Sequence, residues 1–149
     1  MYIMPGYSMM AATATTFMLS IIFLILSKQS KKQYMRFWGI SWLVYSAMFL
    51  LDFCHLNWNF IYLGYVMLRQ MLALLGAYAF LLGTHHFFQT KYPASLGFAA
   101  ILSIISMSFY PAFNMVYTLM VIPNIIFSSG LLIYAGCMFI AISWTQKLP

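Results

Sequence analysis

The stretch NFIYLGYVMLRQMLALLGAYAFLLGTHHFF, residues Asn59 to Phe88, decides the fold class. It holds one fully charged residue, Arg69, and no proline to interrupt a helix. A helix crosses the hydrocarbon core of a bilayer, about 30 Å thick, with roughly 20 apolar residues. The stretch is therefore predicted to span a membrane as a helix. Because it is longer than the bilayer requires, it should tilt or protrude.

Further apolar stretches lie on both sides of this one, and together they predict an all-α, polytopic membrane helix bundle. The five predicted transmembrane helices cover residues 7–27, 37–56, 59–88, 93–110 and 114–145. The last span contains Pro123, which we expect to kink it. The short connections leave no room for a soluble domain, so residues 1–149 are predicted to form a single transmembrane domain.

The composition excludes the common classes of water-soluble protein. Hydrophobic residues make up 64% of the 149 residues and charged residues 5%, whereas soluble domains carry about 25% charged residues. One acid, Asp52, stands against seven bases. A single carboxylate cannot support paired-carboxylate catalysis or a carboxylate-rich calcium or magnesium site. The net charge of +6 indicates contact with anionic lipid, so we expect the lipid bilayer as a partner and no nucleic acid.

The bases outside the spans predict an orientation. They lie in the first and third connections and after the fifth span: Lys28, Lys31, Lys32, Arg36, Lys91 and Lys147. The second connection, near 55–60, and the fourth, near 111–114, contain neither lysine nor arginine. Because these residues concentrate in cytoplasmic loops, we predict a multi-pass protein of the cell (inner or plasma) membrane with its N-terminus outside and its C-terminus inside.

Two charged residues lie inside predicted spans, where charge is costly and usually faces the bundle interior. Asp52 lies near the outer end of the second span, and Arg69 lies about ten residues into the third. A short connection makes these spans antiparallel neighbours, so we hypothesise an Asp52–Arg69 pair, with the longer arginine reaching outward. The pair could be a lock that only orients the helices, or it could border a polar cavity that binds a ligand or responds to pH. A third interpretation is that the two side chains do not touch.

The candidate polar or ligand site consists of the residues expected around that cavity: Asp52, Arg69, His55, Tyr45, Tyr62, Tyr65 and Asn124. On a helical wheel, small residues fall within about 40° of Arg69 and mark a packing seam. The small residues to which we assign helix packing are Ala73, Gly76, Gly83, Gly130 and Gly136.

No metal or cofactor site is expected. His55 lies at the outer boundary, and His85 and His86 lie at the inner one, too far away to share a haem iron. Zinc lacks a plausible ligand set, and His85 and His86 are interpreted as interfacial residues off the packing seam. No nucleophile with an oriented base is visible, so whether the protein is an enzyme stays open.

Three runs then suggest a family resemblance. They are FWGISWLVYSAMFLL (37–51), which follows a basic loop, LRQMLALLGAYAFLLGTHHFF (68–88) and IIFSSGLLIYAGCMFIAIS (125–143). These runs resemble spans of the multi-span N-terminal sensor region of bacterial sensor histidine kinases and diguanylate cyclases. The resemblance is carried by the aromatic start with two tryptophans, the Arg-Gln pair, the small-residue stripe and the alanine-glycine pair.

The resemblance implies an integral-membrane sensor region for signal transduction, of the kind found in two-component systems. It would pass an extracellular or intramembrane stimulus to a cytoplasmic output module, a kinase or cyclase absent from this chain. A sensor of this kind would act as a homodimer. Two other function classes stay open: a small membrane transporter or transporter subunit, with Pro123 and Asn124 as a helix break, and a structural membrane-assembly subunit.

Overall fold

A computed structural model describes residues 4–58, 62–91, 93–98, 101 and 117–145, and within these ranges the chain is helical with no strand. The long helices are α1 (Met4–Ser30), α2 (Gln33–Trp58), α3 (Tyr62–Phe88) and α6 (Tyr117–Thr145). A short helical segment covers 94–98. The predicted all-α class is confirmed.

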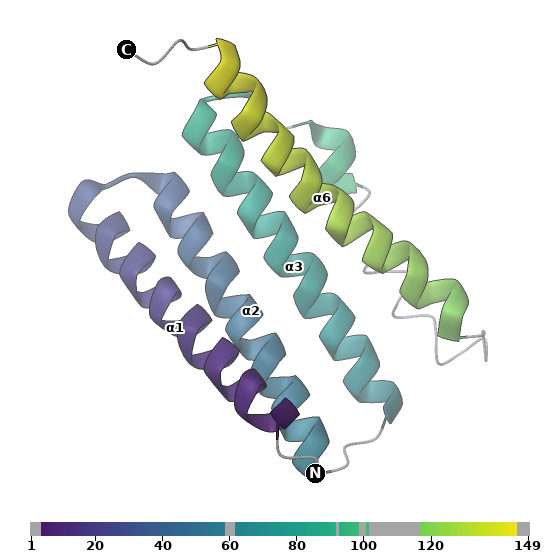
Figure 1. The fold of residues 1–149 in the computed structure, drawn as a ribbon. Coiled ribbons are helices and arrows are strands. Elements are labelled where there is room, and N and C mark those ends of the chain that lie inside the picture. Colours follow the sequence, from purple (N-terminus) through teal and green to yellow (C-terminus); the bar gives the residue numbers. More distant parts are fainter. Residues whose placement is uncertain (1–3, 59–61, 92, 99–100, 102–116, 146–149) are drawn as a thin grey trace.

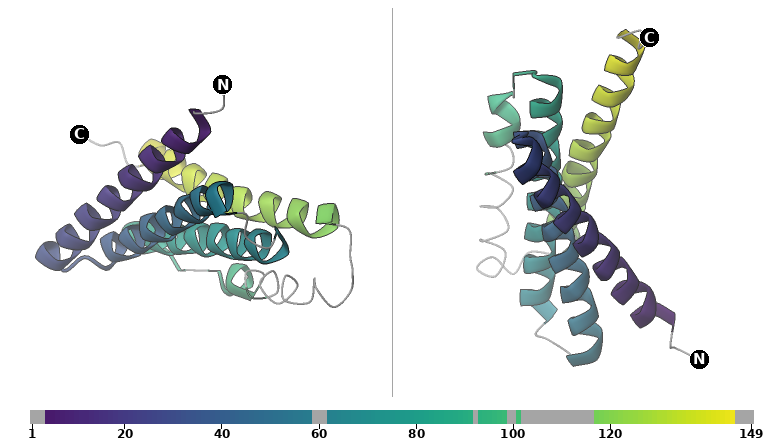
Figure 2. Two further views of the ribbon diagram at one scale, coloured as in Figure 1. Left: turned by 90° about the horizontal axis from the view of Figure 1, so that it is seen from below. Right: turned by 90° about the vertical axis from the view of Figure 1, so that its left-hand side faces the viewer.

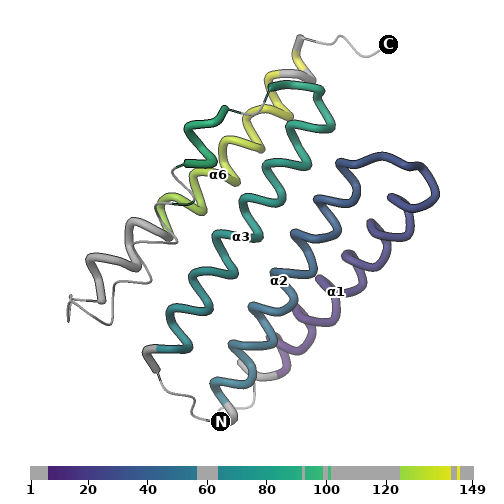
Figure 3. Tube along the Cα trace, turned by 180° about the vertical axis from the view of Figure 1, so that it is seen from behind, coloured from purple at the N-terminus to yellow at the C-terminus, as the bar shows by residue number. Residues whose placement is uncertain are grey.

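The long helices lie next to one another in the order of the sequence (Figure 1). Helices α2 and α3 run antiparallel at the centre, with α1 against α2 and α6 against α3, as the view from behind also shows (Figure 3). Helix α1 crosses α2 obliquely (Figure 2). The α1–α2 connection and the last turns of α3 and α6 lie at the same end of the bundle (Figure 1). We call this the basic end, because residues 28–36 and 86–91 contain five of the seven bases.

Three helical segments are long and apolar enough to cross a membrane: Tyr7–Ser30, Gln33–Leu56 and Gly64–Phe88. They correspond to the first three predicted spans and indicate a membrane protein. A shorter apolar segment, Ile125–Ala141, lies within α6. Most of the predicted fourth span, residues 99–100 and 102–110, lies outside the described residues, as do residues 114–116 of the fifth. The α-helix of α6 runs on through position 123.

The distribution of polar and apolar side chains is the reverse of that in a soluble protein. Large apolar side chains are exposed on the outer surfaces of the helices, among them Met18, Ile22, Ile126 and Ile133. The buried set includes many polar residues: Thr16, Ser20, Ser41, Ser46, Asp52, Gln70, Thr84 and His85. Continuous apolar surface is unstable in water but not in lipid, and small polar residues are common between membrane helices. The bundle is therefore built for an apolar solvent.

Two glycines allow α2 and α3 to approach closely, as the sequence predicts. A Cβ atom at Gly76 would lie 3.1 Å from the ring of Tyr45, and one at Gly83 would clash with the indole of Trp38. Ala73 lies on the same helix and is partly buried. Sequence reasoning missed Gly39, where a Cβ would lie 2.9 Å from the side chain of Leu24 in α1.

The packing role predicted for Gly130 and Gly136 is wrong for the described residues. Both are exposed on α6, and a Cβ atom at either position would meet open space. The fully buried residues of α6 include Leu131 and Ala135, which lie about one turn apart and therefore share a face. They form an apolar core with three residues of α3: Leu74, Ala77 and Leu81.

A buried hydrogen bond also joins α2 to α3, because Ser41 Oγ donates to the carbonyl oxygen of Gly76 at 2.8 Å. We expect Ser41→Ala to lower the free energy of unfolding by about 0.6 kcal/mol, a typical value for such bonds in membrane proteins. The matched control is Ser128→Ala, because the Ser128 hydroxyl donates to the carbonyl oxygen of Ile125 in its own helix. Unfolding in bicelles measures both, and an equal loss in both variants would contradict an interhelical role for Ser41.

Candidate functional site

An ion pair joins α2 to α3 near the end of the bundle opposite the basic end. Arg69 Nε donates a hydrogen bond to Asp52 Oδ1 at 2.9 Å. The Asp52 side chain is 7% exposed and the Arg69 side chain 36%. The sequence predicts this pair, and the antiparallel placement of α2 and α3 brings its two members together.

Two aromatic residues complete what we call the polar cluster: Asp52, His55, Tyr65 and Arg69. Tyr65 donates its hydroxyl hydrogen to Asp52 Oδ1 at 2.8 Å, so this carboxylate oxygen accepts two bonds. The imidazole of His55 stacks on the ring of Tyr65, with centroids 3.8 Å apart and planes at 6°. Each partner thus contacts a residue of the opposite helix.

Helical periodicity explains why these side chains meet. Asp52 and His55 are three residues apart on α2, and Tyr65 and Arg69 are four residues apart on α3. Both spacings place the two residues on one face of a helix, about one turn apart. The facing turns form a unit in which one negative and one positive charge compensate each other within apolar surroundings.

A pocket of about 280 Å³ opens beside the polar cluster, between α1, α2 and α3. Besides the cluster, its walls contain Met9 of α1, Leu56 of α2, and Val66 and Gln70 of α3. Arg69 lines the pocket with a side chain that is 36% exposed, and its bond to Asp52 uses Nε. The terminal amino groups of Arg69 can therefore bind a polar group that enters the pocket.

The structure corrects one predicted member of the site and leaves two undescribed. Tyr45 does not line this pocket, because its ring lies deeper in the bundle, against Gly76. Tyr62 and Asn124 belong to α3 and α6, and their side chains lie outside the described residues. His55, Tyr65, Asp52 and Arg69 come together as predicted.

Sequence reasoning missed four residues of the pocket: Met9, Leu56, Val66 and Gln70. Gln70 is buried, with 5% of its surface exposed, and its place beside Arg69 in an apolar span was a usable signal. Met9 carries no such signal, because its place in the wall depends on how α1 crosses α2. The histidines at the basic end also differ: His85 is buried, contrary to the prediction that it lies off the packing seam, and bonds Thr90 Oγ1 through Nδ1 at 2.7 Å, whereas His86 is exposed.

The charged and hydrogen-bonding groups of the polar cluster can bind a ligand. Among the described ranges, no three His, Cys, Asp or Glu side chains gather in a group that could hold a metal ion. A guanidinium and a carboxylate that neutralise each other can instead exchange partners with an incoming charged or hydrogen-bonding group. Comparisons with protein-family models, curated proteins and solved structures found no match to this chain.

Proposed function

We propose that this chain is the membrane-embedded sensor region of a signalling protein. The observation that carries the proposal is the polar cluster: an ion pair between two apolar helices, open to a pocket of about 280 Å³. A stimulus at the pocket would change the pairing of Arg69 with Asp52. The helices would pass that change to an output module, a kinase or cyclase, at the basic end.

The polar cluster supports a switch because the ion pair is a contact that a ligand can replace. An anionic group in the pocket would compete with Asp52 for the guanidinium of Arg69, and a hydrogen-bonding group would compete with Tyr65 for the carboxylate. A ligand shifts an equilibrium only through different affinities for the two states. The state with the pair broken would bind such a ligand more tightly, which supplies that difference.

The continuity of α2 and α3 supports transmission along the bundle. Both helices run without interruption from the polar cluster to the basic end, over 26 and 27 residues. At the basic end they pack tightly, because Gly83 leaves no space between α3 and the indole of Trp38. Packed helices of this kind move as rigid elements with discrete arrangements, so a shift at one end is carried to the other.

The full proposal includes the topology expected from the sequence. The protein would cross the cell membrane five times, with its N-terminus outside and its C-terminus inside. The polar cluster would then lie in the outer leaflet and the basic end at the cytoplasmic surface. The output module would receive the signal from the end of α6, and the sensor would act as a homodimer.

Pulsed electron paramagnetic resonance tests this proposal through the distance between the ends of α2 and α6. Spin labels replace Arg36 and Trp144, both exposed near the basic end, in a background with Cys54→Ala and Cys137→Ala. We expect Asp52→Asn to shift the distance distribution by about 2 Å, the size of helix shifts in switching proteins. Arg69→Gln should shift it in the same direction, because either change removes one charge of the pair.

The matched control is Thr15→Val, which removes an exposed hydroxyl of α1 that donates to the carbonyl oxygen of Ala11 in its own helix. It should leave the distribution between the labels unchanged. If Asp52→Asn also leaves it unchanged while lowering stability, the pair is only a lock between helices and the sensor proposal is wrong.

A further inference from the structure

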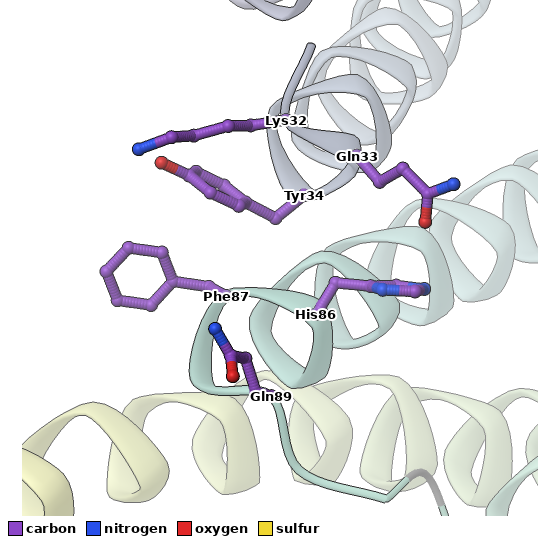
Figure 4. Close-up of a pocket in the computed structure, with 6 residues that line it drawn as sticks. All are labelled: Lys32, Gln33, Tyr34, His86, Phe87 and Gln89. Carbon is purple, nitrogen blue, oxygen red and sulfur yellow. The ribbon is translucent and has the colours of Figure 1, made fainter. Parts of the chain in front are cut away.

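A second pocket, of about 440 Å³, lies at the basic end, far along α2 and α3 from the polar cluster. It lies between the start of α2 and the end of α3 (Figure 4). The first side contributes Lys32, Gln33 and Tyr34, and the second contributes His86, Phe87 and Gln89. We call it the basic-end pocket.

The aromatic side chains hold this pocket in place. The rings of Tyr34 and Phe87 meet edge to face, with centroids 5.0 Å apart, and His86 stacks on Phe37 of α2 at 5.1 Å. The ammonium group of Lys32 lies 5.9 Å from the centroid of the Tyr34 ring, and both side chains extend in the same direction (Figure 4). The start of α2 is thus tied to the end of α3.

The backbone fixes the far wall. Gln89 has a positive φ of 54°, and the amide of Thr90 donates to the carbonyl oxygen of His85 at 3.1 Å. This bond and the left-handed residue form a Schellman motif that ends α3. Lys31, with φ of 57°, makes a similar left-handed turn between α1 and α2. The backbone on both sides of the pocket is therefore held by defined turns.

The chemistry of the pocket favours a phosphate group. Lys32 supplies an ammonium and Gln89 supplies an amide, while the side chains of Gln33 and His86 extend to the opposite side from Lys32 (Figure 4). The neighbouring bases Lys28, Lys31 and Arg36 are exposed, and Asp52, the one acid of the sequence, lies in the polar cluster. The positive charge here has no acidic side chain to neutralise it, so the pocket attracts an anion from outside the chain.

The depth of the pocket indicates where that anion comes from. The apolar segments Tyr7–Ser30, Gln33–Leu56 and Gly64–Phe88 all begin or end at this level. Where the apolar part of a membrane helix ends, the phosphates of the bilayer begin. Phe87 is 40% exposed beside the pocket and can contact an acyl chain while the polar residues hold its headgroup.

We propose that the basic-end pocket binds the phosphate of an anionic phospholipid, which ties the start of α2 to the end of α3. The site lies at the other end of the bundle from the polar cluster, and it stands whether or not the chain is a sensor. It predicts preferential retention of phosphatidylglycerol over phosphatidylcholine by the purified protein.

The test is native mass spectrometry of the purified chain with defined amounts of either lipid. The variant is Lys32→Gln with Gln89→Gly, because glycine keeps the left-handed turn and removes only the amide side chain. We expect its affinity for phosphatidylglycerol to fall about tenfold, with its affinity for phosphatidylcholine unchanged. The control Lys28→Gln removes the same charge outside the pocket and should reduce affinity less than about twofold.

Three results would overturn the proposal. An equal loss in Lys28→Gln and the double variant would mean that the whole basic surface attracts lipid, with no site. Displacement of the lipid by soluble glycerol phosphate at equal concentration would assign the pocket to free phosphate. The absence of any preference for phosphatidylglycerol in the unaltered protein would remove the site altogether. Thermal unfolding of each variant serves as the control that the fold is retained.

Discussion

Asp52→Asn is expected to lower the free energy of unfolding in bicelles by about 3 kcal/mol, the cost of leaving one member of a buried ion pair without its partner. The carboxylate is 7% exposed and accepts bonds from both Arg69 and Tyr65. An asparagine can still accept a bond from either but cannot neutralise the guanidinium. The remaining charge would be held in apolar surroundings, where it is strongly destabilising.

A double replacement separates the charge from the shape of the site. Asp52→Leu with Arg69→Leu should recover at least half of the loss, because no unpaired charge is left between α2 and α3. Tyr65→Phe, which removes one hydrogen bond to the carboxylate, should cost about 1 kcal/mol. Lys28→Gln, on the exposed surface, should change stability by less than about 0.5 kcal/mol. A loss in Asp52→Asn as small as that of Lys28→Gln would contradict the pair.

Gly83→Leu is expected to disrupt the packing of α2 against α3, with a loss of about 3 kcal/mol from overpacking. Trp38, whose indole occupies the space beside Gly83, sits among rings from all four long helices: Phe23, Tyr34, Phe80, Phe87 and Phe139. The indole therefore cannot move aside without displacing its neighbours. Unfolding of the purified variants in bicelles measures the loss.

The matched control for this prediction is Gly130→Leu in α6. A Cβ at Gly130 meets open space, so the new side chain would extend into lipid, and the loss of a helical glycine should slightly stabilise α6. The double variant Gly83→Leu with Trp38→Ala should recover part of the loss, because the smaller residue leaves room for leucine. Equal losses of stability in Gly83→Leu and Gly130→Leu would contradict the close approach of α3 to Trp38.

The parts of the fold and site that the sequence predicts follow from strong constraints. Charged residues are so rare in this chain that Asp52 and Arg69, in adjacent antiparallel spans, have few other possible partners. The face of α3 that contains Arg69 also predicts Tyr65, Gly76 and Gly83 correctly, because helical periodicity determines which residues share a side.

The parts that the sequence does not predict depend on depth and on helix crossing. Tyr45 shares a face with Asp52 but lies seven residues away, about 10 Å along the helix, which a wheel does not display. Residue type alone predicts packing at Gly130 and Gly136, whereas the buried core residues of α6 are Leu131 and Ala135. Met9 reaches the pocket only because α1 crosses α2 where it does.

Solid-state nuclear magnetic resonance in lipid bilayers can measure the separation of the Asp52 carboxyl carbon and the Arg69 Nε through their dipolar coupling. Specific ¹³C and ¹⁵N labelling of the protein isolates this pair, since the chain contains one aspartate. The ion pair at 2.9 Å between nitrogen and oxygen predicts a carbon-to-nitrogen separation of about 4 Å or less. Asp52→Asn removes the labelled carboxyl signal and serves as the control. The absence of measurable coupling in the bilayer would contradict a bundle of lipid-embedded helices joined by this pair.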